Sequence, residues 1–149
     1  MTVMYAKGFY QTIEKSDGAV LAAADNLFTI TGGPILVTEF VGIVTTVIGN
    51  NVATCQIKEV VTEPSGTVSI STAVAITSNA AGTSYTFTTA NPSVLVPTTA
   101  GLFFPIPRIA WLLPIGTINA TCSAANTGVI KWYMGYYMLS QYSKVVAAA

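Results

Sequence analysis

The chain has 149 residues and a formal net charge of zero, because six basic side chains balance six acidic ones. Charged residues make up only 8% of the sequence, whereas apolar residues make up 52%. A chain of this length suits a single domain with its own core, so we expect one domain over residues 1–149. A surface with so few charges favours association with other proteins, since soluble monomers usually carry more of them.

The composition excludes several classes of function. The basic residues stand singly along the chain, which argues against a nucleic-acid site. No apolar run reaches the roughly 20 residues that a membrane-spanning helix needs, so no membrane partner is expected. The first residues lack the pattern of a secretory signal, which favours synthesis in the cytoplasm. Histidine is absent, and with it the usual general base and the commonest transition-metal ligand. We therefore expect no enzyme, no cofactor and no metal site.

The first part of the chain mixes aromatic residues with turn signals. Residues 1–12 predict either an arm that lies along a neighbouring molecule or a first edge strand. Residues 14–18 read Glu-Lys-Ser-Asp-Gly, which is typical of a tight turn because Asp and Gly tolerate positive φ. The only helical turn is expected within residues 19–26.

The most informative stretch covers residues 27–48, where two runs rich in Val, Ile, Thr and Phe are joined by two glycines and a proline. This pattern predicts two strands and a turn. Strict alternation in the second run makes both faces of the strand largely apolar. One face carries Ile35, Val37, Glu39, Val41 and Ile43, and the other carries Leu36, Phe40, Val44 and Ile48. Only one face of each sheet meets the core of a sandwich, so the other face needs a helix, a loop or another subunit.

The next strand is predicted over residues 52–61, with its odd-numbered apolar residues facing inward. Cys55 and, later in the chain, Cys122 occupy inward positions. We expect both to be buried reduced thiols, with a disulfide as the alternative. Glu59 and Glu63 are expected to be surface charges, because a catalytic carboxylate pair must converge across a cleft that nothing in the sequence predicts.

Two segments of contrasting character follow. Residues 67–77 alternate, with Val68, Ile70, Val74 and Ile76 inward, and predict one continuous strand with a single buried face. Residues 98–114 are apolar and aromatic but contain several prolines, which predicts a loop or a broken edge strand. An exposed aromatic loop of this kind would be a contact surface.

The last third predicts a hairpin over residues 117–122 and 129–139. In its second strand, Trp132 and Tyr136 share the inward face, while Tyr133 and Tyr137 face outward. Residues 143–149 are expected to form a tail that frays. Short strands separated by turn signals, with almost no helical periodicity, predict an all-β fold: a single antiparallel β-sandwich, jelly-roll-like.

Three segments together resemble a known family: MYAKGFY at the start, LFTITGGPILVTEFVGIVTT near residue 30, and LPIGTINATCSAANTGVIKWYMGYYML before the Val-Val-Ala-Ala end. They are similar to the capsid decoration, or cement, proteins of tailed bacteriophages. The resemblance implies a homotrimer on the outside of the virion head, which binds the major capsid protein and stabilises its lattice. It carries no catalytic signature.

The residues and the resemblance together predict a structural protein whose task is protein contact. The expected contact residues are the aromatic ones in the Pro-broken segment and on the outward face of the last strand: Phe103, Phe104, Trp111, Tyr133 and Tyr137. Two alternatives stay open. One is a carbohydrate-binding β-sandwich whose aromatic rings stack on sugars, and the other is a tail or neck component of a phage particle.

Overall fold

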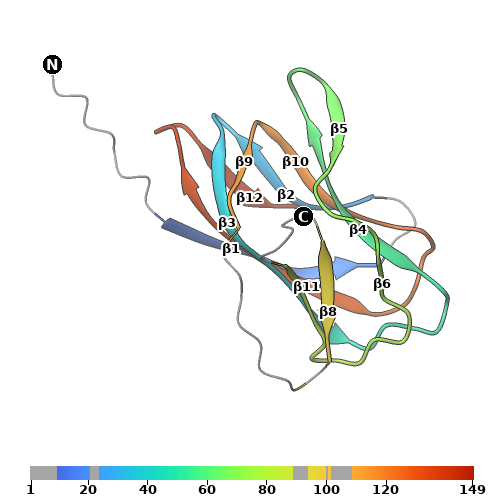
Figure 1. Ribbon diagram of the computed structural model, residues 1–149. Helices are drawn as coiled ribbons and strands as arrows, with labels where there is room; N and C mark the ends of the chain where they lie inside the picture. Colours follow the sequence, from blue (N-terminus) through green and yellow to red (C-terminus); the bar gives the residue numbers. More distant parts are fainter. Residues whose placement is uncertain (1–9, 21–23, 89–93, 100, 102–108) are drawn as a thin grey trace, which may run out of the picture.

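The computed structural model describes residues 10–20, 24–88, 94–99, 101 and 109–149. Within these residues the regular elements are twelve strands, with no helix. The strands form two antiparallel sheets that face each other (Figure 1). None of the described residues belongs to a helix long and apolar enough to cross a membrane.

Six strands build each sheet, and each sheet is named here by its first strand. The β1 sheet has the order β1-β11-β3-β7-β8, with β9 also paired to β3. Its strands are β1 (Tyr10–Ala19), β3 (Ile35–Thr46), β7 (Ser84–Phe87), β8 (Leu95–Thr98), β9 (Trp111–Leu113) and β11 (Val129–Met138). The β2 sheet has the order β12-β2-β10-β4-β5, with β6 also paired to β4. Its strands are β2 (Ala24–Thr31), β4 (Thr54–Val61), β5 (Gly66–Ser69), β6 (Val74–Ala75), β10 (Gly116–Cys122) and β12 (Lys144–Ala147).

The strand pairing identifies the topology. The first half of the chain pairs in reverse order with the second half: β1 with β11, β2 with β10, β3 with β7 and β4 with β5. Strands β1 to β4 also alternate between the two sheets. This is one long hairpin rolled into two layers, which is the jelly-roll arrangement. The predicted all-β antiparallel sandwich is therefore confirmed, and its jelly-roll topology follows from the pairing.

The core lies between the sheets and is rich in aromatic rings. Trp132 on β11 is fully buried, and its ring lies 5.5 Å from that of Phe40. The strands on either side of β11 carry glycines at this level: a Cβ on Gly42 would lie 2.6 Å from the Trp132 ring, and one on Gly18 would lie 2.9 Å from it. The indole thus occupies space that side chains on the two neighbouring strands would otherwise need.

The predicted faces of β3 need a correction. Opposite β11, Gly135 pairs with Glu39 and Tyr136 pairs with Val37, so Thr38 is the extra residue of a β-bulge. A bulge shifts the alternation by one residue. Val37 and Phe40 therefore both point into the core, whereas strict alternation had placed them on opposite faces.

Two further predictions near the N-terminus are wrong. The expected turn at residues 14–18 lies inside β1, where the register with β11 shifts between Lys15 and Gly18. Asp and Gly accommodate a bulge here instead of a turn. Of the expected helical turn at 19–26, residues 24–26 belong to strand β2, and residues 21–23 lie outside the described part of the chain.

The single strand predicted over residues 67–77 is broken in two. The backbone N–H groups of Ile70 and Ser71 both donate to the carbonyl oxygen of Ile57, at 3.0 and 3.1 Å. The Ser71 hydroxyl accepts the Ile57 N–H at 2.8 Å, so a side chain takes the place of a ladder bond. Before the break β5 is exposed throughout and Val68 is 54% exposed, whereas Val74 beyond the break is buried as predicted.

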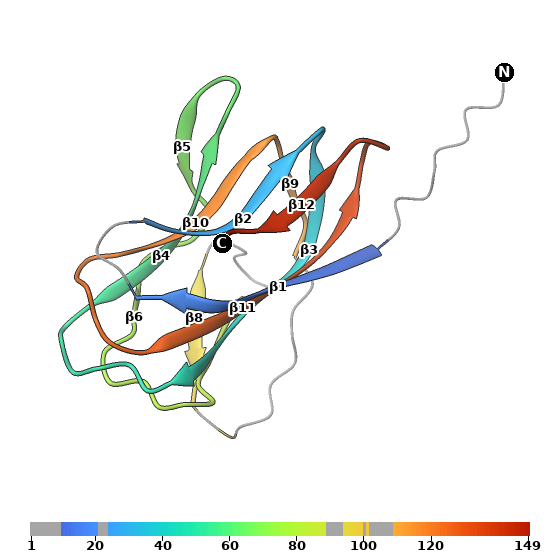
Figure 2. The same cartoon turned by 180° about the vertical axis from the view of Figure 1, so that it is seen from behind.

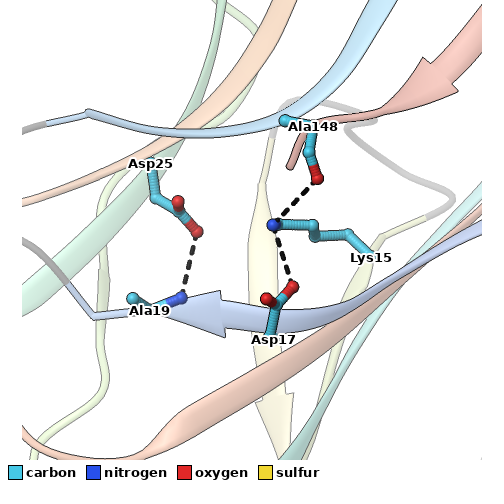
Figure 3. A network of polar contacts seen from close by, with 5 residues as sticks. All are labelled: Lys15, Asp17, Ala19, Asp25 and Ala148. Atoms are coloured by element: carbon cyan, nitrogen blue, oxygen red, sulfur yellow. Dashed lines mark hydrogen bonds and ion pairs between the residues drawn. The ribbon is translucent and has the colours of Figure 1, made fainter.

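The C-terminal segment is a strand and not a frayed tail. Strand β12 pairs with β2, beside which it lies in Figure 2. The buried ammonium group of Lys15 on β1 donates to the Ala148 carbonyl oxygen at 3.0 Å and pairs with Asp17 at 2.8 Å (Figure 3). Asp25 accepts the Ala19 N–H at 3.0 Å in the same view. Lys15 therefore links the end of the chain to the other sheet.

Candidate functional site

The structure separates the residues predicted to make protein contacts. Phe103 and Phe104 lie outside the described residues. Trp111 on β9 is half-buried and packs against the core, with its ring edge-on to Phe87 at 4.5 Å and 6.0 Å from Phe40. The tyrosines at 133 and 137 lie elsewhere, on the outer face of the β1 sheet.

The outer face of β11 carries an aromatic and charged cluster. Tyr137 lies 5.4 Å from the ring of Tyr10 on β1. The Lys131 ammonium group lies 5.3 Å from the centre of the Tyr133 ring and 3.1 Å from the Glu14 carboxylate. Lys131 thus makes a cation–π contact with Tyr133 and an ion pair with Glu14, which links β11 to β1 on this face.

A groove of about 520 Å³ lies on this face, and we call it the tyrosine groove. Its described lining is Thr12, Ile13, Glu14, Glu39, Val41, Ile43, Tyr133, Met134 and Gly135. At one end the Tyr10 hydroxyl donates to Glu39 at 2.5 Å. A Cβ at Gly135 would lie 2.3 Å from that hydroxyl, so the missing side chain makes the hydrogen bond possible. The groove thus combines an apolar floor with two carboxylates.

A second surface lies at one end of the sandwich, where the connections β2–β3, β4–β5, β9–β10 and β11–β12 meet. The β4–β5 hairpin extends beyond the sheets here, at the top of Figures 1 and 2. Six large apolar side chains are exposed at this end, and we call them the apolar end: Val60, Val68, Leu112, Ile115, Leu139 and Tyr142. Leu112 is 67% exposed and Tyr142 is 71% exposed.

Contacts between the turns make the apolar end continuous. A Cβ on Gly32 would lie 1.9 Å from the carbonyl oxygen of Tyr142, and the Leu139 N–H donates to the Pro34 carbonyl oxygen at 3.3 Å. Pro34 in turn lines a cleft of about 540 Å³ together with Ile115. Segments far apart in the sequence therefore form one surface.

Glu59 lies beneath this surface, and its predicted position as a surface charge is wrong. The residue is 3% exposed, and its Oε1 has no hydrogen-bond partner among the described residues. Burial raises the pKa of its carboxyl from an ordinary 4.5 to about 7. The signal was present in the sequence, since Glu59 continues the inward alternation of Cys55 and Ile57, but its charge suggested solvent.

The opposite end of the sandwich is closed by asparagine side chains. Asn126 donates to the carbonyl oxygens of Gly49 and Asn51, at 3.0 and 2.7 Å. Asn51 donates to the Ala125 carbonyl oxygen at 2.8 Å, and Asn79 donates to a buried tyrosine hydroxyl. We call this region the asparagine end. Its turns satisfy one another through hydrogen bonds.

The two cysteines lie opposite each other on β4 and β10. Both are buried free thiols, as predicted, and the disulfide alternative is not what the structure contains. The hydrogen bond with Cys122, followed by burial, raises the pKa of the Cys55 thiol. In the part of the chain that the structure describes, no three His, Cys, Asp or Glu side chains converge as metal ligands would.

Comparison with known proteins gives little. No protein family matches the sequence, and no curated protein matches it. A solved structure titled "Structure of infectious bursal disease virus Gt strain" is similar over 96% of this chain, with 13% sequence identity and a TM-score of 0.25. The present chain spans 38% of the length of that one. A likeness this distant carries no argument about function.

Proposed function

We propose that this protein is a structural component of a virus particle: a decoration protein that binds copies of itself and the major capsid protein on the outside of a phage head. The observation that carries the proposal is the apolar end, where six large apolar side chains are exposed, three on the strands β4, β5 and β9 and three in the β9–β10 and β11–β12 connections. Contiguous apolar surface of this kind is rare on monomers and typical of protein interfaces.

The rest of the molecule is consistent with this role. Charged residues are only 8% of the chain, and the fold is one that viral capsid proteins share with lectins and enzymes. Because a fold hosts many functions, the jelly roll does not decide among them. The sequence resemblance to decoration proteins is what selects a phage head, and it alone implies a trimer.

The mechanism is the addition of apolar contact between shell subunits. Each apolar side chain that leaves water on docking contributes about 1.5–3 kcal/mol when it becomes fully buried. Even a small net gain per site suppresses local opening when it is repeated over a closed lattice. No catalytic group is needed for such a role.

The direct test is binding to phage heads assembled without this protein. We expect the wild-type chain to sediment with the heads and to raise the temperature at which they release DNA. The double variant Leu112→Ser, Tyr142→Ser should bind the heads at least about tenfold more weakly and should raise the release temperature less, because both side chains are largely exposed at the apolar end. Binding to isolated tails in place of heads would support a tail component. Binding to neither would refute the proposal.

A second candidate, carbohydrate binding, is favoured by one observation: the tyrosine groove places an aromatic ring beside two carboxylates. Sugars stack on aromatic rings and hydrogen-bond to carboxylates. Tyr133→Ala should then abolish binding on a glycan array, whereas Tyr142→Ala at the apolar end should not. An array on which the wild-type protein binds nothing would remove this candidate.

A further inference from the structure

A cleft of about 480 Å³ opens between β9 of one sheet and β4 and β5 of the other. Its volume is within the range of small-molecule sites. Its described lining is apolar except for one residue: Val61, Val68, Ile70, Trp111, Leu112, Leu113 and Pro114, with Glu59. The cleft shares Val68 and Leu112 with the apolar end and differs from the rest of that surface in containing a buried acidic group.

Among the described residues, no ion pair involves Glu59 and no hydrogen bond reaches its Oε1 to compensate for its burial. Across the sheet it faces Ile118 on β10 and Val68 on β5, and the described residues that β9 contributes to the cleft are a tryptophan and two leucines. None of these side chains carries a charge, and although the Trp111 indole N–H is a donor, no hydrogen bond from a described residue reaches Oε1 of Glu59. The contrast is Lys15, which is equally buried but pairs with Asp17 and a carbonyl oxygen. Buried charges are normally paired in this way.

We propose that this cleft is a binding site for a small amphipathic amine, whose ammonium group pairs with the Glu59 carboxylate while its alkyl or aryl body lies against Trp111 and Ile70. A carboxylate accepts hydrogen bonds only, and an ammonium group supplies both donors and the opposite charge. A divalent cation fits less well, because it requires several oxygen ligands and the cleft offers one carboxylate. This site does not depend on the proposed role in a virion.

The test is an NMR titration of the full chain with hexylamine and phenethylamine at neutral pH, each compared with its neutral alcohol. We expect saturable shifts at the backbone amides of Ile70 and Leu113 and at the Trp111 indole, with the alcohols at least about tenfold weaker. Glu59→Gln should weaken amine binding by about tenfold or more, and the matched control Glu63→Gln, on an exposed carboxyl, should not. Alcohols that bind as tightly as amines, or amine binding that survives in Glu59→Gln, would overturn the assignment.

A second measurement needs no variant. The pKa of the Glu59 carboxyl can be followed in the wild-type protein by ¹³C NMR, with and without saturating hexylamine. A bound ammonium group favours the ionised form, so the pKa of Glu59 should fall on binding. An unchanged pKa in the presence of the amine would refute the site even if Glu59→Gln failed to fold.

Discussion

The two ends of the sandwich are closed in different ways. At the asparagine end, Asn126 and Asn51 bond to backbone carbonyl groups of neighbouring turns, so the connections hold one another. At the apolar end the turns also touch, but large apolar side chains there are exposed. This end also has two clefts, and among the described residues nothing forms a hydrogen bond with Oε1 of Glu59. The first end also exposes Val47 and Val52, but its turns are held by side-chain hydrogen bonds. The second end combines exposed apolar side chains with two clefts, which are features of a surface that a partner covers.

This difference separates stability from association. Side chains at the asparagine end contribute to folding, because their partners are within the chain. Exposed side chains at the apolar end contribute little to folding, because they remain in water in the isolated protein. Substitutions at the two ends should therefore have opposite consequences for unfolding and for assembly.

The largest stability effect is expected at Glu59. Its folded-state pKa of about 7 is above the ordinary value of 4.5, so the folded state keeps a proton that the unfolded state releases first. The contribution of Glu59 to stability is then fully present below pH 4.5 and is lost as the pH rises through about 7, by up to about 3 kcal/mol. Urea unfolding from pH 4.5 to pH 8 measures this loss.

Glu59→Gln should remove this component of the pH dependence, because an amide does not ionise. Glu63→Gln, which changes an exposed carboxyl, is the matched control and should keep it. If wild type and Glu59→Gln lose stability in parallel over this range, Glu59 is not buried in its neutral form.

A smaller loss is expected at the asparagine end. Asn126→Ala leaves the carbonyl oxygens of Gly49 and Asn51 without their side-chain donor, and should lower the free energy of unfolding by about 1–2 kcal/mol. Asn50→Ala is the control, because Asn50 is an exposed residue of the β3–β4 connection, between Gly49 and Asn51. Urea denaturation measures both. The native mass of either variant should equal that of the wild type, and a change in mass would contradict the separation of the two ends.

The smallest expected effect is on the reactivity of the two cysteines, which belong to the core. The raised pKa of the Cys55 thiol disfavours the reactive thiolate, and both thiols are buried. At pH 8 both thiols should react with a thiol reagent only as fast as the protein unfolds locally or globally to expose them. Rapid reaction of the native protein would show that the sheets open locally at this point.

Sequence patterns predicted the central strands well. In β10 and β11 the alternation is regular, and it placed Cys122 and Trp132 inward and Tyr133 outward, as the structure does. Two of the errors arise at bulges, at Thr38 and between Lys15 and Gly18, because an extra residue is defined only relative to the partner strand. No local pattern in β3 or β1 contains that information.

The candidate sites were less accessible to sequence reasoning. Leu112 and Tyr142 lie at the same end only because the rolled hairpin brings strand β9 and the β11–β12 connection there. Trp111 was expected at a contact surface, but its ring faces Phe87 and its neighbour Leu112 is the exposed residue. That this segment makes protein contacts stays a prediction, and the pairing of β9 with β3 decides which of its described side chains points outward.

The most direct test of the proposed role of the apolar end is the native mass of the protein by light scattering over a dilution series. The wild type should remain an oligomer, a trimer if the resemblance to decoration proteins holds, and Leu112→Ser with Tyr142→Ser should convert it to a monomer of unchanged stability. Val52→Ser is the matched control, since Val52 is 81% exposed at the asparagine end. A wild-type protein that is monomeric at every concentration would contradict self-association through the apolar end.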